Sequence, residues 1–310
     1  MLKFIKYNLW FFIPIIIIFI LLEVLVVNIP TNFSIIGNYL DKNQQTIEVA
    51  TFGSSQVKNA INPVYIDKET INLASTMQHH NTDFKLLKQT RGRLSNLKVV
   101  VFEVSYSHFE IGHNSKYYWK SNVFLKYYDV NLLDRVSFPS DSLLFISHPG
   151  YFSKLLADTY IRKISSIKNN KYGYNENRYK GKFKKLNYDA TAISNSYVKI
   201  NLRANTKIFN YNVAFFYKML DYCQQENLQV IIISPPTHYN YNKLRNSFIL
   251  KRRDSVLAEI SEKYNNVSFL IAEQDPDFTA RKFWNENHLN PDGAKLFSKK
   301  LNKIINQLDE

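Results

Sequence analysis

Hydrophobic residues form one long uninterrupted block near the N-terminus and short separate blocks along the rest of the chain. The long block, residues 9–27, reads LWFFIPIIIIFILLEVLVV and contains a single charged residue, Glu23. A helix of this length rises about 28 Å, close to the ~30 Å hydrocarbon thickness of a bilayer. The pattern therefore predicts one membrane-spanning helix, with Glu23 reaching toward the outer interface.

The charges that flank this block predict its orientation. Lys3 and Lys6 precede it, and the next lysine or arginine is Lys42. Because positive residues stay on the cytoplasmic side, the N-terminus is predicted to be cytoplasmic, with the main domain in the periplasm or on the cell surface. A cleaved signal peptide is the alternative, but the following NIPTNFS contains no Ala-x-Ala cleavage site, which favours retention of the helix.

Beyond the anchor, strand-like runs alternate with segments of helical periodicity. The runs are 46–52, 70–73, 97–104, 230–234 and 267–271, and the helical segments are 82–89, 211–226, 252–264 and one that starts at Pro291. Asn290 is a favourable N-cap for this last helix. Such alternation predicts an α/β three-layer sandwich, with a mainly parallel sheet of about five strands between helices.

Two segments depart from the alternation. The polar residues 31–45 suggest a linker between an anchor at 1–30 and an α/β domain at 46–310. Residues 107–205 are rich in Tyr, Phe, Lys and Asn, and we expect a partly helical insertion over the edge of the sheet. Within it, the basic tyrosine-rich stretch 168–185 predicts a solvated loop, with contact to an anionic glycan or lipid headgroups as the alternative.

Charge and cysteine content indicate which partners and which covalent links the chain can have. The chain has 40 Lys and Arg against 26 Asp and Glu, a formal net charge of +14, which suits a surface facing anionic lipid or polysaccharide. No nucleic-acid fold motif is present, so nucleic acid is not an expected partner. Cys223 is the single cysteine, which excludes an internal disulfide.

Candidate catalytic residues occur in three segments, each directly after a predicted strand or directly before a predicted helix. Phe52-Gly53-Ser54-Ser55 follows the first strand, and a serine on such a tight turn has its hydroxyl exposed above the sheet. Asn72-Leu73-Ala74-Ser75 ends the second strand, and His288 lies just before the last helix. Because ligands bind at the carboxyl ends of parallel strands, His288 could reach Ser55 and act as its general base.

Metal and cofactor sites are not predicted. The adjacent His79 and His80 should point apart, and no acidic cluster accompanies them, so no metal site is expected. No glycine-rich phosphate loop is present, and no cofactor is predicted.

These motifs together resemble the SGNH/GDSL hydrolase superfamily, and more closely its membrane-anchored bacterial branch. That branch includes the D-alanyl transfer protein of teichoic acid synthesis and the alginate O-acetyltransferases. The resemblance implies Ser55 as nucleophile, His288 as base and an oxyanion or substrate site at Gly53, Ala74 and Ser75. It further implies an esterase or O-acyltransferase that acts on cell-envelope polysaccharide through an acyl-enzyme. An acylated glycan, an acyl donor and a membrane acyltransferase are the implied partners.

The sequence departs from this family at two places. Asn285 stands where the family has the aspartate of Asp-x-x-His, and the third family block is replaced by Glu103-Val104-Ser105-Tyr106-Ser107-His108. An asparagine can orient an imidazole, but it cannot stabilise an imidazolium as a carboxylate does. Three alternatives follow: a slow Ser-His dyad, a substitute carboxylate from Glu286, Asp275 or Asp277, or an inactive module that binds a glycan or a membrane partner. A purely structural surface protein is a further alternative.

Overall fold

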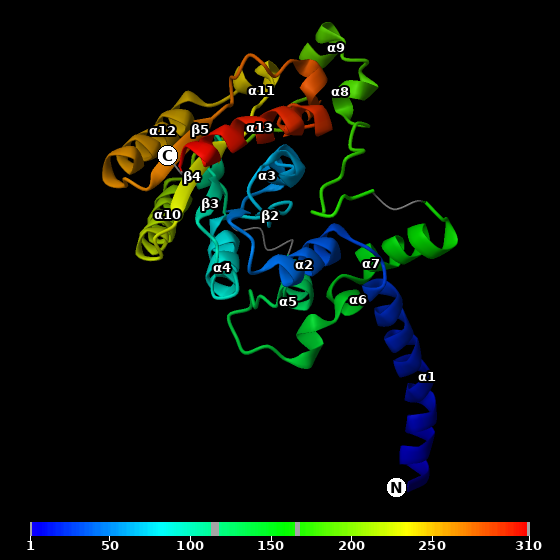
Figure 1. The fold of residues 1–310 in the computed structure, drawn as a ribbon. Coiled ribbons are helices and arrows are strands. Elements are labelled where there is room, and N and C mark those ends of the chain that lie inside the picture. Colours follow the sequence, from blue (N-terminus) through cyan, green and yellow to red (C-terminus); the bar gives the residue numbers. More distant parts are fainter. Residues whose placement is uncertain (1, 113–117, 165–167, 309–310) are drawn as a thin grey trace.

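The predicted parallel sheet is confirmed. The computed structural model describes residues 2–112, 118–164 and 168–308 (Figure 1). Its main sheet has the order β2-β1-β3-β4-β5, and each neighbouring pair is parallel. The strands are β1 (Val49–Thr51), β2 (Thr70–Asn72), β3 (Val99–Glu103), β4 (Gln229–Ser234) and β5 (Val267–Ile271).

Helices cover both faces of this sheet, because both faces of its strands are apolar. Along β3, Val100 and Phe102 belong to one hydrophobic core, whereas Val99 and Val101 belong to the other. The first core also includes α2 (Asn32–Asn43), α4 (His80–Arg91), α10 (Thr206–Gln225) and α12 (Ser247–Lys263). The second includes α3 (Ser55–Ala60) and α13 (Pro291–Gln307). The result is the predicted three-layer sandwich.

Shorter elements complete the chain. Between β3 and α10 lie η2 (His108–Glu110), α5 (Lys120–Tyr128), η4 (Pro139–Ser142), α6 (Leu144–Ser147), α7 (Pro149–Leu156), the π-helical η5 (Ala157–Ile161), α8 (Lys182–Lys185) and α9 (Ala190–Ser194). Elsewhere lie η1 (Pro63–Tyr65), α11 (Tyr239–Asn242), η6 (Ala280–Lys282) and the small antiparallel pair β6 (Phe283–Asn285) and β7 (His288–Leu289).

The N-terminal helix α1 (Leu2–Val27) projects away from the sandwich (Figure 1). Its stretch Trp10–Val27 is long and apolar enough to cross a membrane, and it is almost entirely exposed outside the domain. Glu23 does not simply reach toward solvent, since its carboxylate accepts the backbone N–H groups of Leu144 and Phe145, both at 2.8 Å. The C-terminal end of α1 is therefore attached to the insertion through the first turn of α6.

The segment predicted to be a linker is instead part of the sandwich. Thr31 caps α2 with a capping box, and Phe33, Ile36 and Leu40 of this helix are buried in the first core. Beside α2, α5 of the insertion packs its Phe124 ring against Phe33 at 5.9 Å. Polar residues on the outer face of α2 hid this amphipathic pattern from the sequence interpretation.

The basic tyrosine-rich stretch 168–185 is more than a solvated loop. Tyr174 and Phe183 are buried, and Phe183 belongs to the second core. Tyr179 donates its hydroxyl hydrogen to Asp292 Oδ1 at 3.0 Å. The stretch therefore packs against the elements that surround the candidate active site.

The attachment of α1 predicts where a soluble fragment must begin. Val26 and Ile29 are 1% exposed and belong to the first core. A fragment that begins at Glu23 should unfold at higher temperature than one that begins at Thr31, because losing each buried aliphatic side chain costs about 2–5 kcal/mol. Thermal unfolding of both fragments followed by circular dichroism tests this, and equal midpoints would contradict the packing of residues 23–30.

Candidate active site

The candidate nucleophile lies on a turn that only glycine permits. Gly53 follows β1 with φ +142°, and a Cβ at this position would lie 2.8 Å from the Cβ of Glu103. Ser54 then caps α3 by accepting the N–H of Gln56 at 3.1 Å. Ser55 is the first residue of the helix, so its hydroxyl lies at the carboxyl edge of the sheet.

The structure brings Ser55 and His288 together across 233 residues of sequence. Ser55 Oγ lies 2.8 Å from His288 Nε2, within hydrogen-bond distance. His288 is held by β6 and β7, in which Asn285 is the cross-strand partner of His288. The sequence prediction placed both residues at this edge of the sheet. The short β6–β7 hairpin holds His288 close to Ser55 more firmly than a loop would.

Asn285 occupies the third position behind the imidazole. His288 Nδ1 lies 2.9 Å from Asn285 Oδ1, and the same oxygen accepts the N–H of Asn287 at 3.2 Å. Since a backbone N–H can only donate, this contact identifies the facing amide atom as oxygen. His288 then carries its proton on Nδ1, which leaves the Nε2 lone pair to accept the proton of Ser55.

Burial keeps this imidazole neutral. Burial and, to a lesser extent, the neighbouring Arg178 lower the pKa of His288 to about 4, while Glu103 opposes the shift. The group behind the ring is the neutral amide of Asn285, which does not reverse the effect. His288 could thus accept a proton only weakly, and an imidazolium formed there would be poorly stabilised.

This low pKa predicts an unusual pH profile. A base must be neutral to accept the Ser55 proton, so kcat/KM for an activated ester should stay nearly constant down to about pH 5 and fall as the pH drops through about 4. A histidine with the ordinary pKa of ~6.5 would retain about a tenth of its activity at pH 5.5. Half-maximal activity near pH 6.5 would contradict the desolvation of the half-buried His288 ring and the neutral amide of Asn285 behind it.

Glu103 is a site residue that the sequence interpretation missed. Its buried carboxylate accepts Ser54 N–H at 2.6 Å, Ser54 Oγ–H at 3.0 Å and Ser105 Oγ–H at 2.6 Å, and it lies 3.6 Å from His108 Nδ1. Burial alone would raise the pKa of Glu103, but His108, Ser105 and Ser54 together lower it to about 2. The ionised carboxylate therefore fixes the turn before Ser55. Its signal in the sequence was one acidic residue at the end of an otherwise apolar strand.

The three substitute carboxylates have other partners. Glu286 forms an ion pair with Lys182 and also accepts from Ser196 Oγ at 3.4 Å. Asp275 and Asp277 both bind Lys300 Nζ, at 2.5 and 2.6 Å. His288 hydrogen-bonds to Asn285 instead, so none of these carboxylates takes the third position.

The backbone amides expected to form the oxyanion hole already have acceptors. Ala74 N–H donates to Asn72 Oδ1 at 3.1 Å, and Ser75 N–H donates to Gly53 O at 3.0 Å. The amide of Gly53 is a hydrogen-bond partner of the buried Asp83 carboxyl group. These hydrogen bonds stabilise the turn, and the three amide groups that form them are not free to bind an oxyanion. The Ser55 N–H, which as the first helical residue has no acceptor within α3, is the better candidate.

A cavity of about 440 Å³ opens over the Ser55–His288 pair. Its lining combines polar groups around the pair with apolar and aromatic residues farther along, including Met77, Ile111, Ile200 and Tyr241. A volume of this size accommodates a small ester together with part of its alcohol. The Lys199–Asn201 segment of the insertion forms one wall, so the insertion helps to shape this cavity.

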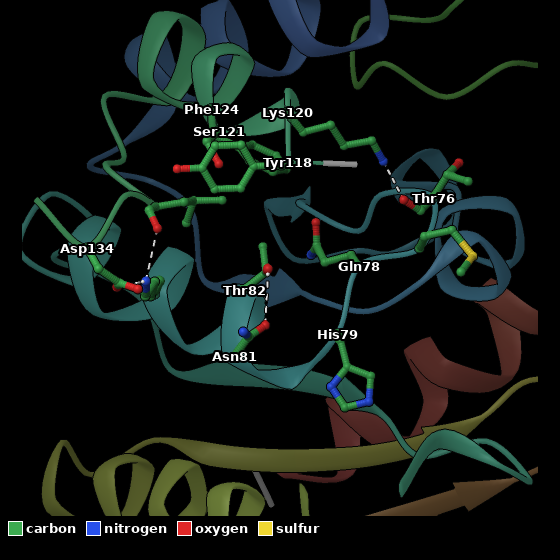
Figure 2. Close-up of a pocket in the computed structure, with 13 residues that line it drawn as sticks. Thr76, Gln78, His79, Asn81, Thr82, Tyr118, Lys120, Ser121, Phe124 and Asp134 are labelled. Atoms are coloured by element: carbon green, nitrogen blue, oxygen red, sulfur yellow. Dashed lines mark hydrogen bonds and ion pairs between the residues drawn. The ribbon is translucent and has the colours of Figure 1, made fainter. Parts of the chain in front are cut away.

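A second cavity, of about 290 Å³, lies beside the first and shares Met77, Gln78 and His79 with it (Figure 2). Lys120 reaches across this cavity to the Thr76 carbonyl, and its Nζ also donates to Ser75 Oγ at 2.9 Å. These contacts connect the first residue of α5 to the turn after β2, where Ser75 is buried.

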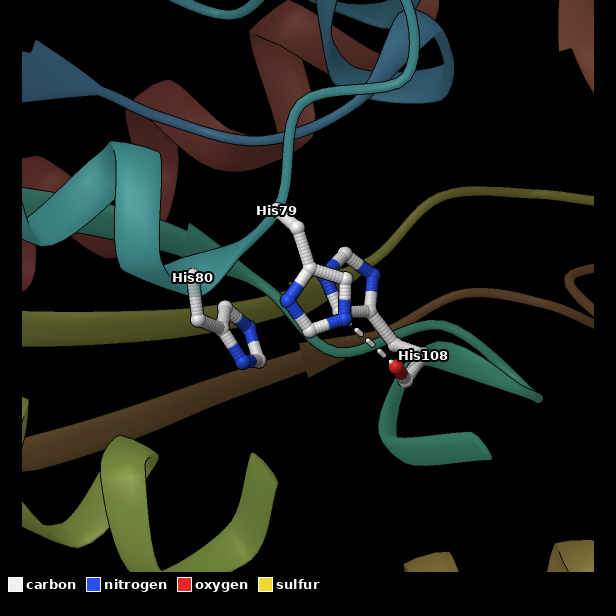
Figure 3. A group of neighbouring side chains, drawn as sticks. All are labelled: His79, His80 and His108. Atoms are coloured by element: carbon white, nitrogen blue, oxygen red, sulfur yellow. Dashed lines mark hydrogen bonds between the residues drawn. The ribbon is translucent and has the colours of Figure 1, made fainter. Parts of the chain in front are cut away.

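Three histidines gather behind the pocket, contrary to the prediction that His79 and His80 point apart (Figure 3). His108 joins them, and their ligand atoms lie within 4.8 Å of one another. The rings of His80 and His108 are stacked, with centroids 4.3 Å apart at 26°, so their lone pairs lie in nearly parallel planes and do not converge on one ion. Nε2 of His79 and of His80 donates to the carbonyls of His108 and Glu103 at 2.9 and 2.8 Å. The cluster therefore supports β3 and its Glu103.

Comparisons with known proteins find similarity in structure but none in sequence. No family model matches the chain, and no curated protein matches its sequence. The structure is similar to a solved GDSL-like lipase. That lipase, from Bacteroides thetaiotaomicron, is 12% identical, with 89% of this chain and 99% of that chain covered and a TM-score of 0.42. A provisionally assigned acylhydrolase from Bacteroides fragilis is 9% identical over 87% of this chain and 95% of its own, with a TM-score of 0.41. We therefore base the function on the geometry of Ser55, His288 and Asn285.

Proposed function

We propose that this protein is a membrane-anchored serine acyl-esterase or O-acyltransferase of the SGNH type. The observation that supports it most is the continuous line of hydrogen bonds from Ser55 Oγ through the His288 ring to Asn285 Oδ1, at 2.8 and 2.9 Å. Nucleophile, base and orienting group in this order are the arrangement that acyl transfer requires. The cavity above the serine gives an ester access to it.

In the proposed reaction, His288 Nε2 takes the Ser55 proton while Oγ attacks the carbonyl carbon of an ester. The tetrahedral oxyanion would be stabilised by the Ser55 N–H and the start of α3. Collapse returns the proton from Nε2 to the leaving alkoxide and leaves an acyl group on Oγ. Water or a sugar hydroxyl, deprotonated by His288, then removes the acyl group. Water would make the protein an esterase, and a sugar hydroxyl an O-acyltransferase.

The proposed substrate class is inferred from the expected position of the domain outside the membrane and from its charge. With the N-terminus in the cytoplasm, the domain would lie on the outer side of the membrane, where polysaccharides of the cell envelope are found. The net charge of +14 suits an anionic glycan. An acyl donor delivered by a membrane acyltransferase would supply the transferase version of the reaction.

An inactive binding module is the second candidate function, and Asn285 favours it. A neutral amide behind the imidazole gives the imidazolium no charge stabilisation, and in a serine triad this exchange costs about 10⁴ in rate. Such a module would use the same cavity to hold an acylated glycan without cleaving it.

Neighbouring serines allow a matched test of the proposed activity. The full chain should hydrolyse nitrophenyl acetate, and Ser55→Ala should reduce this to the level without enzyme. Ser54→Ala should stay active, because the Ser54 hydroxyl only caps α3 and contacts Glu103, although losing the cap should cost about 1 kcal/mol of stability. Equal activity of the wild type and Ser55→Ala, with both folded, would favour the binding module.

A further inference from the structure

A third cavity, of about 250 Å³, lies where the chain leaves α1. Residues 29–32, directly after the membrane helix, form one wall, and α7 with the residues after η5 forms another through Tyr151, Leu155 and Ile164. Lys58 and Asn59 of α3 and Arg178 of the insertion close it on the side of the active site. The cavity is thus apolar toward the membrane helix and basic toward the sandwich.

Its two cations have no anionic partner among the residues that the structure describes. Lys58 lies over the ring of Phe33 at 5.9 Å, and Arg178 lies over the ring of Trp284 at 4.5 Å. Arg178 Nε is buried without a hydrogen-bond acceptor in the described part of the chain. Two partly buried cations that face one cavity repel each other, and an anion between them would remove this cost.

The acidic residue of the lining does not neutralise them. Asp158 pairs with Arg162 at 2.6 Å, within its own segment. Burial and the nearby Arg178 together lower the pKa of Lys58 to about 8, as expected for a lysine beside another cation. The cavity therefore retains positive charge that none of the described acidic residues pairs with.

The surroundings of the cavity indicate which anion reaches it. Ile146, Ile161 and Ile164 are 56%, 79% and 57% exposed, an unusual apolar group for a surface that faces only water. Ile146 belongs to α6, Ile161 is the last residue of η5, and Ile164 follows η5. In this region, beside the C-terminal end of α1, Tyr160 donates its hydroxyl hydrogen to Leu25 O at 3.1 Å (Figure 1). Since Leu25 is part of the candidate membrane span, this region would lie at the level of the lipid headgroups when α1 spans a membrane.

We propose that this cavity binds the phosphate of an anionic phospholipid headgroup between Lys58 and Arg178, with the lipid chains directed toward the bilayer beside Ile161 and Ile164. The apolar wall and the direct connection to the membrane helix favour a lipid over a soluble polysaccharide. Asn59 lines the cavity and donates its side-chain N–H to Ser55 O, so a bound headgroup would also fix α3 and the candidate nucleophile relative to the membrane surface.

Lipid binding can be measured without any ester chemistry, so its failure is distinct from failure of the proposed activity. The full chain in dodecyl maltoside is titrated with dioleoyl phosphatidylglycerol or dioleoyl phosphatidylcholine and followed by native mass spectrometry. The wild type should bind one phosphatidylglycerol at least about tenfold more tightly than phosphatidylcholine, because both lipids carry the phosphate but only phosphatidylcholine brings a trimethylammonium cation beside Lys58 and Arg178. Lys58→Gln/Arg178→Gln should remove this preference.

Two further variants control for charge and folding. Lys154→Gln/Arg203→Gln removes the same charge from exposed positions outside the cavity and should leave the preference unchanged. Lys58→Arg/Arg178→Lys keeps both charges and should retain it. Equal binding of the two lipids by the wild type, or an undiminished preference in the folded Gln/Gln variant, would overturn the proposal. Binding of inorganic phosphate as tight as that of phosphatidylglycerol would overturn the lipid assignment.

Discussion

Replacing Asn285 by aspartate should raise kcat for a small activated ester by at least about tenfold, toward the ~10⁴ that a carboxylate contributes in serine triads. The reason is the position of Asn285 Oδ1, 2.9 Å from His288 Nδ1. A carboxylate there would stabilise the imidazolium that forms when Ser55 is deprotonated. It would also raise the pKa of His288 from about 4, so the acid limb of the pH profile should move upward.

Asn287→Asp is the matched control for this gain. It adds the same charge two residues away, in the same cavity lining, without taking the place of the imidazole's hydrogen-bond acceptor. Its activity and pH profile should stay close to those of the wild type. An equal gain in both variants would mean that general charge, not a carboxylate behind the ring, limits the reaction. No gain in Asn285→Asp would contradict the assignment of Asn285 to the third position.

Loss of Ser55 and loss of His288 should be strongly non-additive. Because every proton transfer of the imidazole serves the formation or breakdown of the acyl group on Ser55, Ser55→Ala and His288→Ala should each lower kcat to nearly the same residual rate, and the double variant should be no slower than either. Steady-state kinetics of the three variants, each shown to be folded by circular dichroism, measure this directly. Multiplicative losses would show that the two side chains act independently.

The sheet and the Ser55–His288 pair were predictable because both follow from the order of apolar strands and amphipathic helices along the chain. Apolar runs such as 97–104, separated by helical periods, favour a covered parallel sheet, and in such a sheet every strand ends at the same edge. Topology then brings a serine after β1 and a histidine before α13 to the same edge. The β6–β7 hairpin fixes the histidine there, and the two side chains form the hydrogen bond at 2.8 Å.

Other features depend on partners that are distant in sequence, and local patterns do not reveal them. The polar segment 31–45 forms α2, because α5, about 90 residues later, covers its apolar face. Glu103 is ionised inside the core only because Ser54, Ser105 and His108 surround it. Likewise, the amides of Ala74 and Ser75 were expected to be available, but the chain's own turn uses them.

Acylation of Ser55 is the most direct test of the proposed chemistry. The full chain in detergent is incubated briefly with nitrophenyl acetate, quenched in acid, digested and analysed by tandem mass spectrometry. We expect the mass of one acetyl group on the Ser55 peptide of the wild type. Asn285→Asp, which keeps His288, should carry more acetyl group at the same short quench time. The corresponding peptide of Ser55→Ala should carry none. Folded wild-type protein that leaves Ser55 unmodified, or that acquires the acetyl group equally on other residues, would contradict a serine acyl-enzyme.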